Sequence, residues 1–166
     1  VHTAMAFTFF LGIVFTVIGV ALSPWMLQLM LQREGESAVY PFARDYLVIY
    51  FSGVLGIMIY NMGSGVLRAV GDSSRPFYFL VVSAVVNTGL DLLFVFKFHM
   101  GVRGVAWATV IAQGLSAVLT VVTLFLTRSA VRMSPRALKI DPHILGRILT
   151  VGLPAALQMA LTAFSN

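Results

Sequence analysis

The stretch that decides the fold is PFYFLVVSAVVNTGLDLLFVF, residues Pro76–Phe96, in which Asp91 is the only charged side chain. An α-helix rises about 1.5 Å per residue, so about 20 mainly apolar residues span the roughly 30 Å hydrocarbon core of a bilayer. The run has this length, and it lacks the alternating pattern of a membrane barrel strand. We therefore predict a transmembrane α-helix over 76–96, with Pro76 well placed at its N-terminus.

Similar apolar runs lie on both sides of this stretch, and they cover residues 4–31, 46–67, 105–126 and 144–166. In the first of them a kink is expected near Ser23-Pro24, because proline removes a backbone hydrogen bond. The predicted fold class is all-α, a multi-pass transmembrane helical bundle. Small residues near the start of the run 105–126 would allow a neighbouring helix to approach closely. These are Gly101, Gly104, Ala106 and Ala108.

The composition agrees with a membrane location. Of the 166 residues, 59% are hydrophobic and 10% are charged, against about 25% charged residues in an average soluble domain. The mean hydropathy is +0.94. A soluble surface cannot be built from so few charges, which excludes a free-standing soluble enzyme, a disordered tail and a nucleic-acid-binding module. The chain has no cysteine and no catalytic arrangement of Ser, His and Asp, so we predict no enzyme activity, no cofactor and no nucleic-acid partner.

Both ends of the sequence indicate a piece of a larger membrane protein. The chain begins at Val1 without an initiator Met, and it stops at Asn166 directly after an apolar run. The opening stretch is much longer than the apolar part of a signal peptide, which has about 7–15 residues. We expect the remaining helices of the same protein, together with membrane lipid, to be its partners.

Lysine and arginine residues in the short loops predict the orientation, because cytoplasmic loops carry an excess of them. One side has four such residues and the other has seven. We therefore expect the loop 68–75 and the segment 127–143 to lie in the cytoplasm, with the protein in the cell membrane. The four are Arg33, Arg44, Lys97 and Arg103, and the seven are Arg68, Arg75, Arg128, Arg132, Arg136, Lys139 and Arg147.

The segment 127–143 is the longest polar stretch, and we expect it to separate a lobe formed by 1–126 from a second unit beginning at 144. Asp141-Pro142 is typical of a helix start, with Asp as N-cap and Pro as first residue. Pro135–Ile140 could form a short helix at the membrane interface, and a solvated linker is an equally good interpretation.

Asp91 is the main candidate for a functional residue. A charge near the middle of a bilayer costs about 2.5–3.5 kcal/mol on insertion scales, so such a residue usually faces a polar interior. Burial disfavours the charged form of a carboxyl group, which can then bind and release a proton, and with oxygen ligands it can hold Na⁺ instead. Asn87 lies one helical turn earlier on the same face. The alternative is that Asp91 is simply hydrated near the outer interface.

Other polar residues in the apolar runs are weaker candidates. Thr109 is expected at about the depth of Asp91 and could be its partner, although a bond to its own backbone is the common alternative. Asn61 lies in the inner half of its run and needs a polar partner or water. Tyr46 and Tyr50 are typical of the interfacial aromatic belt. Spacing alone does not join Asn61 or the tyrosines to Asp91.

Four motifs resemble those of the multidrug and toxic compound extrusion (MATE) transporters. They are RAVGDSSRP at 68–76, NTGLD at 87–91, GVRGVAWAT at 101–109 and GLP at 152–154. The first is a loop motif whose notable residues are Arg68, Gly71, Asp72, Arg75 and Pro76. The resemblance implies part of a twelve-helix transporter with two lobes: four helices of the N-terminal lobe, a cytoplasmic link and the start of the seventh helix.

The resemblance also implies a function, namely efflux of small cationic or amphipathic organic compounds by antiport with H⁺ or Na⁺. Many prokaryotic members hold the coupling ion in the N-terminal lobe. The corresponding positions here are Tyr46, Asn61, Asn87, Asp91 and Thr109, and the family's first-helix Asp lies outside this chain. Na⁺ at Asp91 would be the only bound metal. Two alternatives remain: a lipid-linked oligosaccharide flippase, disfavoured because no Arg or Lys lies in the middle of a run, and a non-transporting membrane subunit.

Overall fold

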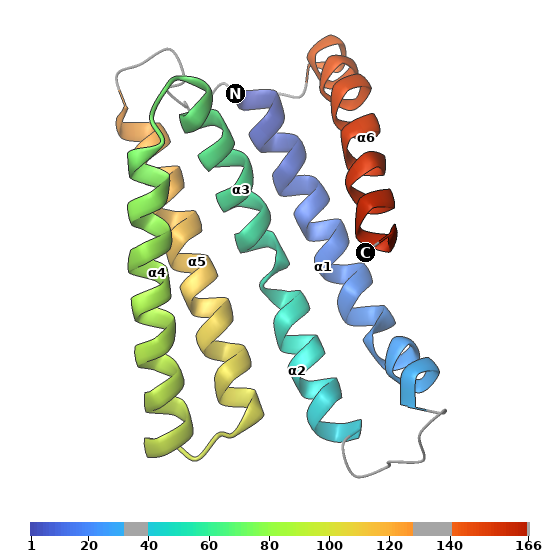
Figure 1. Cartoon of the computed structure of the whole chain (residues 1–166), viewed down its shortest axis with the longest axis vertical. Coiled ribbons are helices and arrows are strands. Elements are labelled where there is room, and N and C mark those ends of the chain that lie inside the picture. Colours follow the sequence, from blue (N-terminus) through green and yellow to red (C-terminus); the bar gives the residue numbers. More distant parts are fainter. Residues whose placement is uncertain (32–39, 128–140, 166) are drawn as a thin grey trace.

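The computed structural model describes residues 1–31, 40–127 and 141–165, and these parts are helical with no strand. Five helical stretches are long and apolar enough to cross a membrane, at 2–29, 40–69, 74–97, 102–126 and 142–162. The predicted all-α, multi-pass bundle is therefore confirmed. In order, the elements are α1 His2–Leu31, α2 Tyr40–Ser52, α3 Val54–Ala69, α4 Ser74–Leu92, the π-helix η1 Leu93–Lys97, α5 Val102–Leu126 and α6 Pro142–Ser165 (Figure 1).

The run expected as one helix over 46–67 is divided into α2 and α3 at Gly53. The Gly53 N–H bonds to the Tyr50 carbonyl at 3.0 Å, and the Gly56 N–H bonds to the Gly53 carbonyl at 3.0 Å. Both bonds span three residues instead of the four that are usual in an α-helix. A Cβ on Gly53 would lie 2.8 Å from Val110 Cγ2 of α5. The break therefore belongs to a place where two helices approach closely, and hydropathy does not reveal such contacts.

The loop motif 68–76 joins α3 to α4 and is explained by helix capping. Gly71 has φ +85°, and the Asp72 N–H reaches back to the Leu67 carbonyl at 3.0 Å, which closes the end of α3. Asp72 Oδ1 accepts a bond from the Arg75 N–H at 3.2 Å at the start of α4. Helix α4 begins two residues before Pro76, which is buried. The motif thus forms a tight turn between two antiparallel helices.

Other helix ends differ slightly from the prediction. The stretch 76–96 ends in the π-helix η1 rather than in regular α-helix, and α5 begins three residues earlier than expected. Helix α1 runs through Pro24, with the Ser23 hydroxyl donating to the Gly19 carbonyl at 2.7 Å, and its last turns bend from the axis (Figure 1). Asp141 Oδ1 accepts from the His143 N–H at 2.9 Å, as expected of an N-cap. The proposed interfacial helix Pro135–Ile140 lies outside the described residues.

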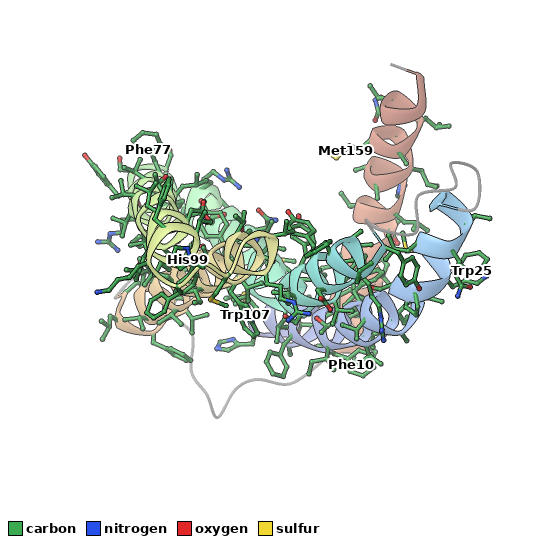
Figure 2. The ribbon with its side chains drawn as sticks, turned by 90° about the horizontal axis from the view of Figure 1, so that it is seen from below. Phe10, Trp25, Phe77, His99, Trp107 and Met159 are labelled. Carbon is green, nitrogen blue, oxygen red and sulfur yellow. The ribbon has the colours of Figure 1, made fainter. Side chains whose placement is uncertain are left out.

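Helix α5 lies at the centre of the bundle and packs against α2, α3 and α4. Ala106 and Ala108 are fully buried and Gly104 is buried, so the expected close approach holds for these three. Gly101 is exposed, and a Cβ there would meet nothing within 4 Å. Toward the other end, Leu124 packs with Leu67 of α3 in the apolar core. Helix α6 stands apart from this layer (Figure 2) and contacts α1 near its own start.

Candidate functional site

A cavity of about 320 Å³ lies among α3, α4 and α5, inside the bundle. Three of the predicted site residues line it: Asn61 from α3, Asn87 from α4 and Thr109 from α5. Gln113, one turn after Thr109 on α5, also lines it and was missed in the sequence. The full lining is Ile57, Tyr60, Asn61, Leu80, Ser83, Ala84, Asn87, Thr109, Ala112, Gln113 and Ser116.

The relative depth of these residues follows from one contact between α4 and α5. The Ser83 hydroxyl donates to the Ala112 carbonyl, and the two helices run in opposite directions (Figure 1). Four residues further along α4 and four residues back along α5, Asn87 is therefore level with Ala108, the residue before Thr109. Asp91 lies one more turn outward, about 6 Å away along the axis. The expected equal depth of Asp91 and Thr109 is thus wrong by a little more than one turn, because the register of two helices depends on their packing.

Asp91 and Asn87 both carry buried polar atoms that no other group satisfies. Within the described parts of the chain, Asp91 Oδ1 and Asn87 Nδ2 are shielded from solvent and have no hydrogen-bond partner. Such groups are costly to bury unless a proton, a cation or water completes their bonding. The two residues lie on the same face of α4, one turn apart. Their surroundings therefore suit a small ligand that supplies the missing interactions.

The hydroxyl groups around the cavity donate to backbone carbonyls. Thr109 Oγ1 donates to the Val105 carbonyl at 3.0 Å, which is the alternative considered for this residue. Ser116 Oγ donates to the Gln113 carbonyl at 2.9 Å, and the Tyr60 hydroxyl donates to the Pro76 carbonyl at 3.0 Å. Each oxygen keeps lone pairs, so these groups can accept a hydrogen bond or ligate a cation, but their protons are already committed.

Tyr46 does not line the cavity. Its ring stacks on Tyr50, with centroids 6.0 Å apart, in α2. At the same end of the bundle, Asp45 Oδ2 accepts from Arg103 Nε at 2.8 Å and also from Nη2, which ties α2 to the start of α5. The structure therefore brings Asn61, Asn87 and Thr109 together, sets Asp91 one turn beyond them, and leaves Tyr46 in a separate aromatic pair.

A second cavity of about 630 Å³ lies beside the first, among α1, α3 and α6. Its lining is mainly apolar, and Asn61 belongs to the walls of both cavities. It extends to Ala69, the last residue of α3. Its lining is Phe7, Thr8, Leu11, Met58, Asn61, Met62, Gly65, Val66, Ala69 and Ile148.

Five helices of membrane-spanning length, with an open and mainly apolar pocket among three of them, define a multi-pass membrane protein. The chain belongs to the MatE family, whose model matches residues 1–93. Members of this family are transporters and not enzymes.

Three relatives illustrate the match. The chain is 38% identical over 149 residues to "Probable multidrug resistance protein YpnP" of Bacillus subtilis (strain 168), covering 90% of this chain and 32% of that protein. It is 34% identical over 173 residues to "Probable multidrug resistance protein YoeA" of the same strain, covering 100% of this chain and 37% of that protein. A crystal structure of MATE in the bent conformation gives a TM-score of 0.81 at 26% identity, over 96% of this chain and 36% of that one. The chain thus spans about a third of the length of the relatives that it matches.

Proposed function

We propose that the protein works in secondary active efflux, exporting small cationic or amphipathic organic compounds in exchange for H⁺ or Na⁺ across the cell membrane. Membership of the MatE family and the names of the relatives, multidrug resistance proteins, support the efflux part of this proposal. The coupling ion binds at Asp91, with Asn87 beside it and with Thr109 and Asn61 in the adjoining cavity. Tyr46, stacked on Tyr50, remains a candidate member of the site on the family resemblance alone.

The observation that carries the proposal is the unsatisfied pair on α4, Asp91 Oδ1 and Asn87 Nδ2. A proton on the carboxyl group would remove its charge and provide a donor. A Na⁺ ion would instead be ligated by the carboxylate and by neutral side-chain oxygens. Either event changes the interactions of α4 with its neighbours, and so changes which arrangement of the helices is preferred. This is how an ion gradient would drive release of the substrate.

The orientation follows from the positive-inside rule. The turn between α3 and α4 and the start of α6 lie at the same end of the bundle (Figure 1). Arg68, Arg75 and Arg147 belong to that end. We propose that it faces the cytoplasm, together with the link 127–143 between the two lobes, and that the Asp45–Arg103 ion pair faces outward.

The experiment that tests the function uses the complete protein in proteoliposomes with an imposed H⁺ or Na⁺ gradient. Asp91→Asn keeps the size of the side chain and removes its charge, so gradient-driven efflux of a cationic dye should be abolished while expression is normal. Asp45→Asn makes the same chemical change in the outer ion pair and serves as the matched control, with efflux retained. Unchanged efflux in Asp91→Asn would refute the role of Asp91.

The same preparation separates the alternatives. Purified antiporter should bind the dye, and H⁺ or Na⁺ should displace it. A lipid-linked oligosaccharide flippase or a non-transporting subunit should show no such displacement.

A further inference from the structure

Three amide side chains, one from each of three helices, reach the 320 Å³ cavity without a hydrogen bond in the described parts of the chain. They are Asn61 on α3, Asn87 on α4 and Gln113 on α5. An amide offers a carbonyl oxygen and an NH₂ group, so each can receive a cation or hold the water around it. The hydroxyls nearby donate to the backbone, which leaves these amides as the polar groups of the cavity whose donors are not engaged.

The amides are spaced along the bundle axis at different depths. Asn87 is level with Ala108, and Gln113 lies five residues further along α5, about 7–8 Å inward. Helices α3 and α5 run in the same direction (Figure 1), and Gly63 faces Thr120. Asn61, two residues before Gly63, is therefore level with residue 118 and about 7–8 Å further inward than Gln113.

Gln113 also lies beside the break between α2 and α3. A Cβ on Gly53 would be 3.1 Å from Gln113 Oε1, so the amide occupies the space that this glycine leaves. At the break the Gly56 N–H bonds to the Gly53 carbonyl, which deprives the Ser52 carbonyl of its usual donor. Interrupted transmembrane helices of this kind are where secondary transporters handle their coupling ions. Gln113 thus places an amide group directly beside this helix break.

We propose that Gln113 forms the middle of a polar route along which the coupling cation moves inward, from Asn87 to Asn61. At Asn61 the route meets the second cavity, because this residue belongs to the walls of both. The second cavity continues to Ala69 at the inner end of α3. The steps between neighbouring groups are about 7–8 Å, a little more than one helical turn. The inference rests on the proposed function, and it assigns Gln113 to movement of the ion and not to its binding at Asp91.

The test replaces Gln113 by leucine in the complete protein, reconstituted in proteoliposomes. Two quantities are measured for the gradient that drives the wild type: the rate of dye efflux, and the concentration of Na⁺ or H⁺ that displaces half of the bound dye at equilibrium. The efflux rate should fall about tenfold or more, the size expected when a charged group loses one polar contact. The half-displacing concentration should change less than about twofold, because the Asp91 end is intact.

Two further variants sharpen this result. Gln158→Leu makes the same change on α6, which does not line the 320 Å³ cavity, and should leave both quantities as in the wild type. Gln113→Asn keeps an amide with one methylene less, and it should restore a large part of the rate. Its rate should lie between those of Gln113→Leu and the wild type. If Gln113→Leu is not produced, a wild-type rate in Gln113→Asn overturns the route.

Each outcome supports or overturns the route. A wild-type rate in Gln113→Leu overturns it, and so does a loss of rate accompanied by an equal loss of equilibrium displacement, which would make Gln113 part of the binding site itself. Failure of the proposed function looks different. The wild type would then show no gradient-driven efflux, or Asp91→Asn would transport normally.

Discussion

Replacing Gly104 by alanine should destabilise the complete protein, whereas the same change at Gly114 on the same helix should not. A Cβ on Gly104 would lie 2.9 Å from Phe94 Cβ and 3.0 Å from Met100 Cβ. Both neighbours are atoms next to the backbone, so they cannot move away by a simple rotamer change. A Cβ on Gly114 would meet nothing within 4 Å.

The comparison of the two variants isolates the packing cost. Alanine is the better helix former by about 1 kcal/mol, and this gain applies to both positions. Forcing extra volume into a packed site costs about 1–3 kcal/mol. The propensity gain cancels in the difference, so Gly104→Ala should be less stable than Gly114→Ala by about 1–3 kcal/mol. Gly114→Ala itself should equal or exceed the wild type.

The assay is equilibrium unfolding of the complete protein in mixed micelles with increasing SDS, followed by tryptophan fluorescence. The free energy of unfolding is obtained for the wild type and both variants under identical conditions. Equal stability of Gly104→Ala and Gly114→Ala would refute the reasoning. It would mean that the start of α5 is not packed tightly against Phe94 of η1 and Met100.

Two other predictions concern single interactions. Gly71→Ala should lower the free energy of unfolding by about 1 kcal/mol, because an L-residue at φ +85° is strained although no atom lies within 4 Å. Gly65→Ala, which is also uncrowded but has an ordinary helical φ, should not lower it, and equal losses at the two sites would contradict this. Ser83→Ala removes the hydroxyl that donates to the Ala112 carbonyl of α5. It should cost about 0.6 kcal/mol, up to about 1.7, and an unaltered SDS unfolding curve would speak against that interhelical bond.

The number and the approximate limits of the membrane helices could be predicted from the sequence because they follow from apolar length alone. The limits that differ are set by contacts between helices. The break at Gly53 depends on the approach of Val110, and the depth of Thr109 relative to Asp91 depends on the bond between Ser83 and Ala112. These contacts join residues distant in the sequence, and no local pattern encodes them.

Only part of the candidate site could be predicted from the sequence. Asp91 and Asn87 stand out because a charge and an amide interrupt an apolar run. Gln113 interrupts the run 105–126 in a similar manner, and that signal was available, but its importance depends on the cavity that it shares with Asn61. The pairing of Tyr46 with Tyr50 could not be predicted from the composition of the run, and the belt interpretation of both residues stays a prediction.

The chemistry of serine and threonine explains why the amides and Asp91 dominate this interior. A short hydroxyl in a helix can donate to the carbonyl one turn earlier, as Thr109 does, and is then satisfied by its own helix. An amide inside a helix has no such local solution, because the backbone around it is already bonded, so it must find a partner elsewhere. In the described chain Asn61, Asn87 and Gln113 find none, and a bare carboxylate oxygen lies one turn away. Of these groups, Asn87 and Asp91 carry buried atoms without a partner. Their burial has a cost that packing alone does not require, which is the physical reason to expect an ion or water beside them.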